Sequence, residues 1–202
     1  MRVLVACEYS GRVRDAFLKK GHDAMSCDLL PTDSPGPHYQ GDIFDIIGDG
    51  WDLMIAHPPC TYLTYAGNRH WNAPGRAEKR EEALAFFKRL YRAPVPRKCL
   101  ENPVGYVNSV FRQPDQIIEP YYFGDPFKKR TCLWLVDLAP LDHAAEDTLF
   151  MNKTHVDVEP AYYRPDGKAI HFTEAVRPDK DRWKIRSATF PGIAAAMARQ
   201  WG

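Results

Sequence analysis

Short apolar segments alternate with helical patterns along most of the chain, and this alternation is the strongest constraint on its fold. Val3 to Ala6 is a compact run rich in β-branched residues, and residues 11–20 follow it with apolar side chains at helical spacing. Ala24 to Cys27 then predicts a second strand that ends at Asp28. Strands that alternate with helices indicate a doubly wound α/β fold with a mainly parallel sheet.

The alternation continues through the middle of the chain. A buried strand is predicted at residues 52–57, where Pro58-Pro59 stops it, and the clearest helix follows at residues 76–92. Further elements are predicted as strands at 97–100, 116–118 and 131–136 and as a final helix at 193–201. Residues 137–185 contain four prolines and little periodicity, so we interpret them as a short irregular insertion in a single domain formed by residues 1–202.

Composition limits the partners and the compartment. Lys plus Arg (27) nearly balances Asp plus Glu (26), so attraction to nucleic acid must come from local basic patches. We expect a cytoplasmic protein with no membrane segment, because no apolar run approaches the ~20 residues needed to span a bilayer and the first residues lack the pattern of a signal peptide. The five cysteines form no C-x-x-C pair, and no two histidines have the spacing of metal ligands. This pattern predicts reduced thiols and no metal site.

Polar residues cluster where the predicted strands end. In open parallel sheets, ligands bind beyond the carboxyl ends of the strands. The residues found there are Glu8-Tyr9-Ser10-Gly11 after the first strand, Asp28 after the second, Asp42 in a later loop, Pro58-Pro59-Cys60, and Glu101-Asn102-Pro103. We therefore expect these loops to face one cleft.

Two carboxylates in this set suit a nucleoside cofactor. Asp28 closes the second strand, where an acidic side chain can accept hydrogen bonds from ribose hydroxyls. Asp42 could accept from an exocyclic amine of adenine, with Ile43 and Phe44 beside the ring. The alternative for both aspartates is a cap or turn residue. Gly11 alone does not make a phosphate-cradling loop, so the expected cofactor lacks a pyrophosphate.

The order of these motifs resembles that of the DNA cytosine-5 methyltransferases, particularly the short forms found in phages and prophages. The resemblance is carried by Pro58-Pro59-Cys60, Glu101-Asn102-Pro103, residues 124–130 and residues 190–201. It implies a Rossmann-like methyltransferase sheet, S-adenosyl-L-methionine as cofactor and DNA as partner. The implied cofactor contacts are Glu8, Tyr9, Ser10, Gly11, Asp28, Leu29, Asp42, Ile43 and Pro58.

The resemblance also implies the catalytic residues. Cys60 would add to C6 of cytosine, since C5 is too weakly nucleophilic until the conjugation of the ring is broken. Glu101 would hold N3 of the base in a protonated or hydrogen-bonded form. Arg130, or Lys129 beside it, would contact the base or the phosphates. The base must be flipped out of a duplex or presented unpaired.

The insertion is short for a target-recognition domain, so we expect low sequence selectivity. It carries basic and aromatic residues suited to contact nucleic acid, namely Tyr162, Tyr163, Arg164, Lys168, His171, Phe172, Lys180, Arg182, Trp183, Lys184 and Arg186. One alternative function is modification of a free cytosine nucleotide, or transfer of another one-carbon group. Another is an inactive protein that binds DNA or cofactor as a decoy, although the presence of both Cys60 and Glu101 argues against it.

Overall fold

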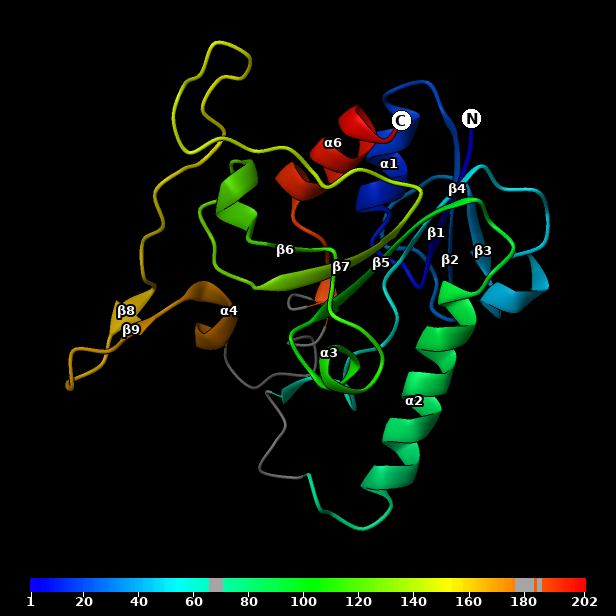
Figure 1. Ribbon diagram of the computed structural model, residues 1–202, viewed down its shortest axis with the longest axis horizontal. Helices are drawn as coiled ribbons and strands as arrows, with labels where there is room; N and C mark the ends of the chain where they lie inside the picture. The colour runs from blue at the N-terminus through cyan, green and yellow to red at the C-terminus, as the bar shows by residue number, and fades with distance from the viewer. Residues whose placement is uncertain (66–70, 177–183, 185–186) are drawn as a thin grey trace.

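Seven strands form the central sheet of the computed structural model, which describes residues 1–65, 71–176, 184 and 187–202 (Figure 1). Their order is β3-β2-β1-β4-β5-β7-β6. The strands span Arg2–Ala6 (β1), Asp23–Asp28 (β2), His38–Gln40 (β3), Leu53–Ala56 (β4), Arg97–Pro103 (β5), Gln116–Ile118 (β6) and Thr131–Val136 (β7). β7 runs antiparallel to both of its neighbours, whereas all other pairs are parallel. The expected class, a doubly wound Rossmann-like α/β sheet, is confirmed.

Helices cover both faces of the sheet, because the central strands are apolar on both sides. In β1, Val3 and Val5 face one core and Leu4 and Ala6 face the other. The first core is closed by α1 (Arg12–Leu18) and α6 (Pro191–Gln200), which lie side by side in Figure 1. The second core is closed by α2 (Arg76–Tyr91) and α3 (Tyr106–Val110).

The long helix α2 follows the apolar spacing that predicted it. Leu84, Phe87 and Leu90 are buried against the sheet, and the ring of Phe87 meets that of Trp134 edge to face at 5.0 Å between centroids. None of the helices in the described part of the chain has the length and apolar character needed to span a bilayer.

Some short elements are absent from the sequence-based prediction. The strand β3 lies at the edge of the sheet and none of its three residues is buried, so its sequence lacks an apolar signal. In the insertion, β8 (Tyr162–Tyr163) pairs with β9 (Ala169–Ile170), and α4 (Phe172–Ala175) follows. Residues 137–161 contain no helix or strand, as expected for an irregular segment.

Candidate active site

The carboxyl ends of the parallel strands gather the predicted site residues at one edge of the sheet. Glu101 is the fifth residue of β5, which therefore extends through the whole Glu101-Asn102-Pro103 motif. Because β7 is antiparallel, its first residue, Thr131, pairs with Pro103 at that edge. Lys129 and Arg130, which directly precede β7, are thereby brought next to the end of β5.

The strand β4 ends because of its two prolines. The amide of His57 still donates to the carbonyl of Ala6 at 2.9 Å, but Pro58 and Pro59 have no amide proton to continue the ladder. The chain then turns, and the carbonyl of Cys60 accepts hydrogen bonds from two amides further along, each at 2.9 Å. Cys60 itself is partly exposed. Because they carry Cys60, the predicted nucleophile, residues 58–64 are called the nucleophile loop.

Three contacts tie the nucleophile loop to the segment that carries Glu101. The side-chain amide of Asn102 donates to the carbonyl of Pro58 at 2.8 Å. The amide of Tyr106 donates to the carbonyl of Leu63 at 2.7 Å, and Thr64 forms an antiparallel bridge with Gly105. Cys60 and Glu101 therefore lie on two backbone segments whose relative position is fixed.

Gly105 permits this close approach, and we expect its replacement by alanine to disturb the site. A Cβ atom at residue 105 would lie 2.0 Å from the carbonyl oxygen of Leu63, which is backbone and cannot rotate away. The substitution should cost about 1–3 kcal/mol of unfolding free energy, measured by urea denaturation. Gly48→Ala is the control, because nothing lies within 4 Å of its Cβ position. Equal stability of the two variants would contradict this packing.

The carboxylate of Glu101 is paired inside the site. Its Oε2 atom lies 3.0 Å from Nδ1 of His57, and both side chains are largely buried. Burial by itself raises the pKa of Glu101, but the Lys129 ammonium and the hydrogen bond from His57 outweigh it and hold the pKa below its usual value. Glu101 is therefore an ionised hydrogen-bond acceptor at neutral pH.

Of the two predicted cations, Lys129 acts more directly on Glu101. Its ammonium is the largest attractive charge on that carboxylate, and it lies 6.0 Å from the ring centroid of Phe190. The backbone amide of Lys129 donates to Glu119 at 2.7 Å, which anchors the segment. Arg130 is exposed, and its charge acts on Glu119 and Cys132.

The other cysteines are poor candidates for a nucleophile. Burial is the main cause that raises the pKa of the thiols of Cys7, Cys27, Cys99 and Cys132. At Cys27 the pKa rises to about 12. These thiols therefore stay protonated at neutral pH and behave as small apolar side chains.

The two predicted cofactor carboxylates lie close together. Asp28 ends β2, and Asp42 follows β3, the neighbouring strand in the sheet. Burial raises the pKa of the Cys7 thiol, and the charges of both aspartates raise it further. Each aspartate uses one oxygen locally: Asp28 accepts from the amide of Leu30 at 3.0 Å, and Asp42 caps the 3-10 helix η1 (Ile43–Asp45) through the amide of Phe44 at 3.0 Å. Among the described residues, neither second oxygen accepts a hydrogen bond, so both suit a ligand with hydroxyl or amine donors.

The apolar residues expected around the cofactor differ in exposure. Leu29 is 74% exposed beside Asp28, a position open to a ligand. Ile43 is only 4% exposed and packs in the core. Its side chain therefore anchors the loop and is not exposed for contact with the adenine ring. The half-buried ring of Phe44 is the more accessible neighbour. Pro58 is buried and acts through its carbonyl.

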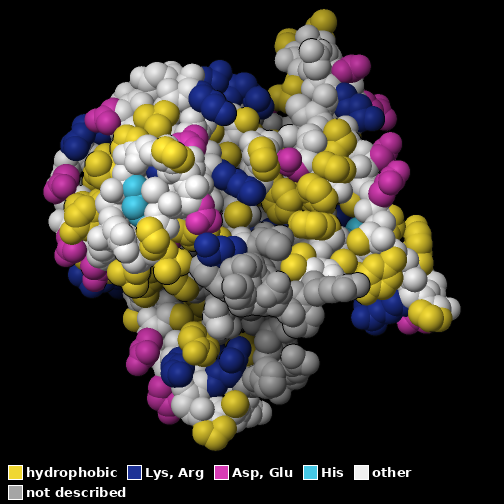
Figure 2. Space-filling view, turned by 180° about the vertical axis from the view of Figure 1, so that it is seen from behind, with side chains coloured by type: hydrophobic (Ala, Val, Ile, Leu, Met, Phe, Trp, Pro, Cys, Tyr) yellow, Lys and Arg dark blue, Asp and Glu magenta, His cyan; other side chains and the backbone are white. Residues whose placement is uncertain are grey.

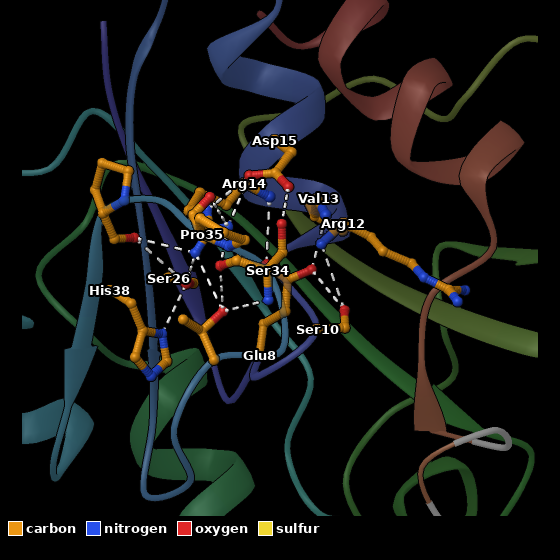
Figure 3. A network of polar contacts seen from close by, with 12 residues as sticks. Glu8, Ser10, Arg12, Val13, Arg14, Asp15, Ser26, Ser34, Pro35 and His38 are labelled. Carbon is orange, nitrogen blue, oxygen red and sulfur yellow. Dashed lines mark hydrogen bonds and ion pairs between the residues drawn. The ribbon is translucent and has the colours of Figure 1, made fainter.

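The loop between β1 and α1 is shaped by Glu8 (Figure 3). The buried carboxylate accepts hydrogen bonds from the amides of Val13 at 2.7 Å and Arg14 at 3.3 Å, at the positive end of α1. The sequence-based prediction placed Glu8 in contact with the cofactor, but the structure directs its side chain to the helix. Gly11 has a φ of 71°, and a Cβ atom there would lie 2.4 Å from the guanidinium of Arg14.

The guanidinium of Arg14 is the centre of the network in Figure 3. Although charged, the side chain is completely buried, and it pairs with Asp15 at 2.8 Å. It also donates to the hydroxyl of Ser26 at 3.1 Å and to the carbonyl of Ser34 at 2.9 Å. Arg14 therefore fixes the loop that follows Asp28 against α1.

Tyr9 and Ser10, two predicted cofactor contacts, line a cavity of about 530 Å³. Arg12, Asp125 and Phe190 also border it, so both charges and an aromatic ring are available there. The hydroxyl of Tyr9 is bonded to the carbonyl of Lys184 at 3.0 Å and contacts Ser187 at 3.1 Å. The cavity therefore lies between the loop that follows β1 and the segment before α6.

Three residues of the site had no predicted role. These are His57, Asn102 and Arg14. His57 directly precedes Pro58-Pro59-Cys60 and Asn102 follows Glu101, so adjacency to the motifs was the available signal. Arg14 carries no such signal, because a lysine- and arginine-rich helix usually exposes its charges. Within the described part of the chain, no cluster of His, Cys, Asp and Glu could hold a metal ion.

The similarity of the chain to known proteins is confined to solved structures. No protein-family model and no curated protein matches the sequence. Among solved structures, the chain is similar to the Entamoeba histolytica methyltransferase EhMeth, with 13% identity, a TM-score of 0.48, and coverage of 78% of this chain and 57% of that one. It is also similar to the S. pombe Dnmt2 methyltransferase, with 17% identity, a TM-score of 0.41, and coverage of 67% and 48%.

The chain thus spans about half the length of these two structures. Both similarities are too low to indicate a shared activity.

Proposed function

We propose that the chain transfers a methyl group from S-adenosyl-L-methionine to C5 of cytosine in DNA. The observation that carries this proposal is the fixed pairing of two segments, the nucleophile loop with Cys60 and the end of β5 with Glu101. A partly exposed thiol and an ionised carboxylate held at one edge of a Rossmann-like sheet suit a reaction in which a ring is attacked on one side and polarised on the other.

In the proposed reaction, the thiolate of Cys60 forms a bond to C6 and opens the C5–C6 double bond. N3 of the base takes up a proton from solvent and becomes positively charged, and the carboxylate of Glu101 accepts a hydrogen bond from that N3–H. The electron pair of the opened double bond then neutralises N3 and leaves an enamine. S-adenosyl-L-methionine, when bound, would supply the electrophilic methyl group, with S-adenosyl-L-homocysteine as the leaving group when the bond to C5 forms. Loss of the C5 proton to a base then restores the C5–C6 double bond and breaks the S–C6 bond. Cys60 leaves as a thiolate, and N3 returns its proton to solvent.

The low pKa of Glu101 favours a carboxylate that accepts a hydrogen bond from N3–H over a carboxylic acid that protonates N3. A carboxylate that is already ionised cannot donate a proton to N3, but it stabilises positive charge there. The proton on N3 therefore comes from solvent. Lys129 helps to keep Glu101 ionised, while Arg130 is exposed and available for a phosphate.

The residues around Asp28 fit the proposed cofactor. The second oxygen of Asp28 suits a ribose hydroxyl, and that of Asp42 suits the amine of adenine. The cavity lined by Tyr9 and Ser10 is also bordered by two cations, Arg12 and Lys184, and by two carboxylates, Asp33 and Asp125. Groups of both signs suit the carboxylate and the ammonium of the methionine portion.

The insertion is the proposed contact surface for DNA. Tyr162 and Tyr163 in β8 are 51% and 66% exposed, and Leu149 and Phe150 at a loop tip are more than nine-tenths exposed. Figure 2 shows the insertion standing away from the body, with apolar side chains at its tip. Exposed aromatic rings stack on unpaired bases, so this surface suits a flipped or single-stranded target. Lys180, Arg182, Trp183 and Arg186 lie outside the described residues.

The test is incubation of the protein with methyl-labelled S-adenosyl-L-methionine and, separately, duplex DNA, single-stranded DNA and dCMP. We expect 5-methylcytosine in DNA by mass spectrometry, and a covalent adduct with DNA that contains 5-fluorocytosine. A product found only in dCMP would identify a nucleotide-modifying enzyme, and a different mass increment would identify another one-carbon group. Binding of DNA or cofactor without product or adduct would contradict the proposal and indicate a decoy.

Glu101→Gln should retain cofactor binding and lower kcat for methyl transfer by roughly 10²-fold or more. The neutral amide cannot balance the positive charge that develops at N3. The measurement is steady-state transfer alongside cofactor affinity by calorimetry. Glu78→Gln, an exposed carboxylate at the start of α2, is the control. Near-normal turnover of the Glu101 variant would remove this residue from the mechanism.

A further inference from the structure

His57 has an unusual environment for a histidine in a proposed active site. Its side chain is only 8% exposed, and Nδ1 lies 3.0 Å from Oε2 of Glu101. Its other ring nitrogen, Nε2, is buried and has no hydrogen-bond partner among the described residues. The backbone of His57 is fixed by its hydrogen bond to Ala6 at the end of β4.

These contacts select one protonation state of the ring. A proton on Nε2 alone would leave the lone pair of Nδ1 facing an ionised carboxylate, which is repulsive. A doubly protonated ring would leave a charged N–H donor buried without an acceptor, which is costly. The neutral ring with its proton on Nδ1 donates to Glu101 and leaves only a lone pair unpartnered.

The hydrogen bond from His57 also makes the two carboxylate oxygens of Glu101 different. Oε2 is committed to His57, whereas Oε1 accepts no hydrogen bond from any described residue. Because His57 belongs to the strand that leads into the nucleophile loop, the ring links the carboxylate to the segment that carries Cys60.

We propose that His57 is a positioning residue whose neutral ring, protonated at Nδ1, holds Oε2 of Glu101 and leaves Oε1 for the cytosine. This inference rests on the function proposed above. His57 thereby fixes the orientation of Glu101 relative to Cys60, and it acts on turnover through Glu101 without touching the base.

Two substitutions separate this role from simple packing. His57→Phe keeps a ring of similar size but has no donor, and it should lower kcat by roughly 10- to 100-fold, as expected for the loss of one hydrogen bond to a charged group. His57→Asn places an amide donor where Nδ1 lies, and it should recover most of that loss. The KM for DNA should change little in both variants, since the bound base keeps its other contacts.

A measurement on the unaltered protein tests the same contact without any activity. In protein labelled with ¹⁵N-histidine, two-bond ¹H–¹⁵N spectra distinguish a proton on Nδ1 from one on Nε2, and the signal missing in His57→Asn assigns residue 57 among the seven histidines. We expect Nδ1 protonated and Nε2 bare at pH 7. A proton on Nε2 would overturn the proposal whether or not the variants fold.

The outcomes also separate this inference from the proposed function. If the wild-type protein modifies no cytosine substrate, the proposed function fails, and the Nδ1 proton alone decides whether His57 holds Glu101. If the wild-type protein is active and His57→Phe turns over at the same rate, the positioning role is overturned while the proposed function stands. Equal losses in His57→Phe and His57→Asn would also overturn it, because packing and not the donor would then be responsible.

Discussion

Replacement of Cys60 by alanine should lower methyl transfer by roughly 10⁴-fold or more, since loss of a nucleophile removes the whole covalent route. The same variant should form no adduct with DNA that contains 5-fluorocytosine. Cys60→Ser should behave similarly, because a hydroxyl is a far weaker nucleophile than a thiolate at neutral pH. Denaturing electrophoresis of the trapped complex, with mass spectrometry of the attached peptide, measures the result.

Thr61→Ala is the matched control for Cys60. The side chain of residue 61 is exposed in the same loop, and its backbone carbonyl accepts a hydrogen bond from Arg76 at 3.2 Å. Among the described residues its side chain makes no hydrogen bond. We expect wild-type adduct formation in this variant. An adduct that persists without Cys60, or one attached to another cysteine, would contradict the nucleophile assignment and with it the proposed mechanism.

Replacement of Arg14 by leucine should lower the free energy of unfolding by about 3–5 kcal/mol. The guanidinium is fully buried and bonded to Asp15, Ser26 and Ser34, so its removal leaves one buried and two partly buried acceptors without this donor. Urea denaturation monitored by tryptophan fluorescence gives the value. Cofactor affinity should also fall, because the loop beyond Asp28 loses its anchor.

Lys19→Ala is the control for Arg14, as it removes a positive charge from the exposed end of the same helix. Its effect should stay within about 0.5 kcal/mol. Arg14→Lys should be intermediate, because a single ammonium cannot reach all the acceptors that the planar guanidinium reaches. If Arg14→Leu were as stable as Lys19→Ala, the network in Figure 3 would have no structural importance.

The sequence predicted most of the sheet because burial on both faces leaves a strong local signal. β6 and β7 occur at the predicted residues, and β1, β2 and β4 differ by one or two residues at their ends. The reversed direction of β7 could not be predicted, since an apolar run has the same pattern in either direction. β3 was missed because it is an edge strand with no buried residue, so its sequence lacks an apolar run.

The candidate site was predicted less completely than the sheet, because the direction of a side chain has no local sequence signal. A sequence places a residue after a strand but does not say where its side chain points. Glu8 turns back to cap α1, and Ile43 packs into the core. His57 was overlooked because a lone histidine beside a motif has no spacing that predicts a partner, and its contact with Glu101 joins residues 44 positions apart.

The late position of β7 in the chain, after its neighbour β5, has a consequence for synthesis on the ribosome. Until residue 136 has emerged, β5 has no neighbour on one side, and its unpaired amides and carbonyls are available to other strands. Lys129 is also missing from a nascent chain that ends before residue 129, although Cys60 and Glu101 are already present. Prematurely terminated fragments should therefore aggregate and lack activity, and ribosome-bound intermediates of this length are where a chaperone would be needed.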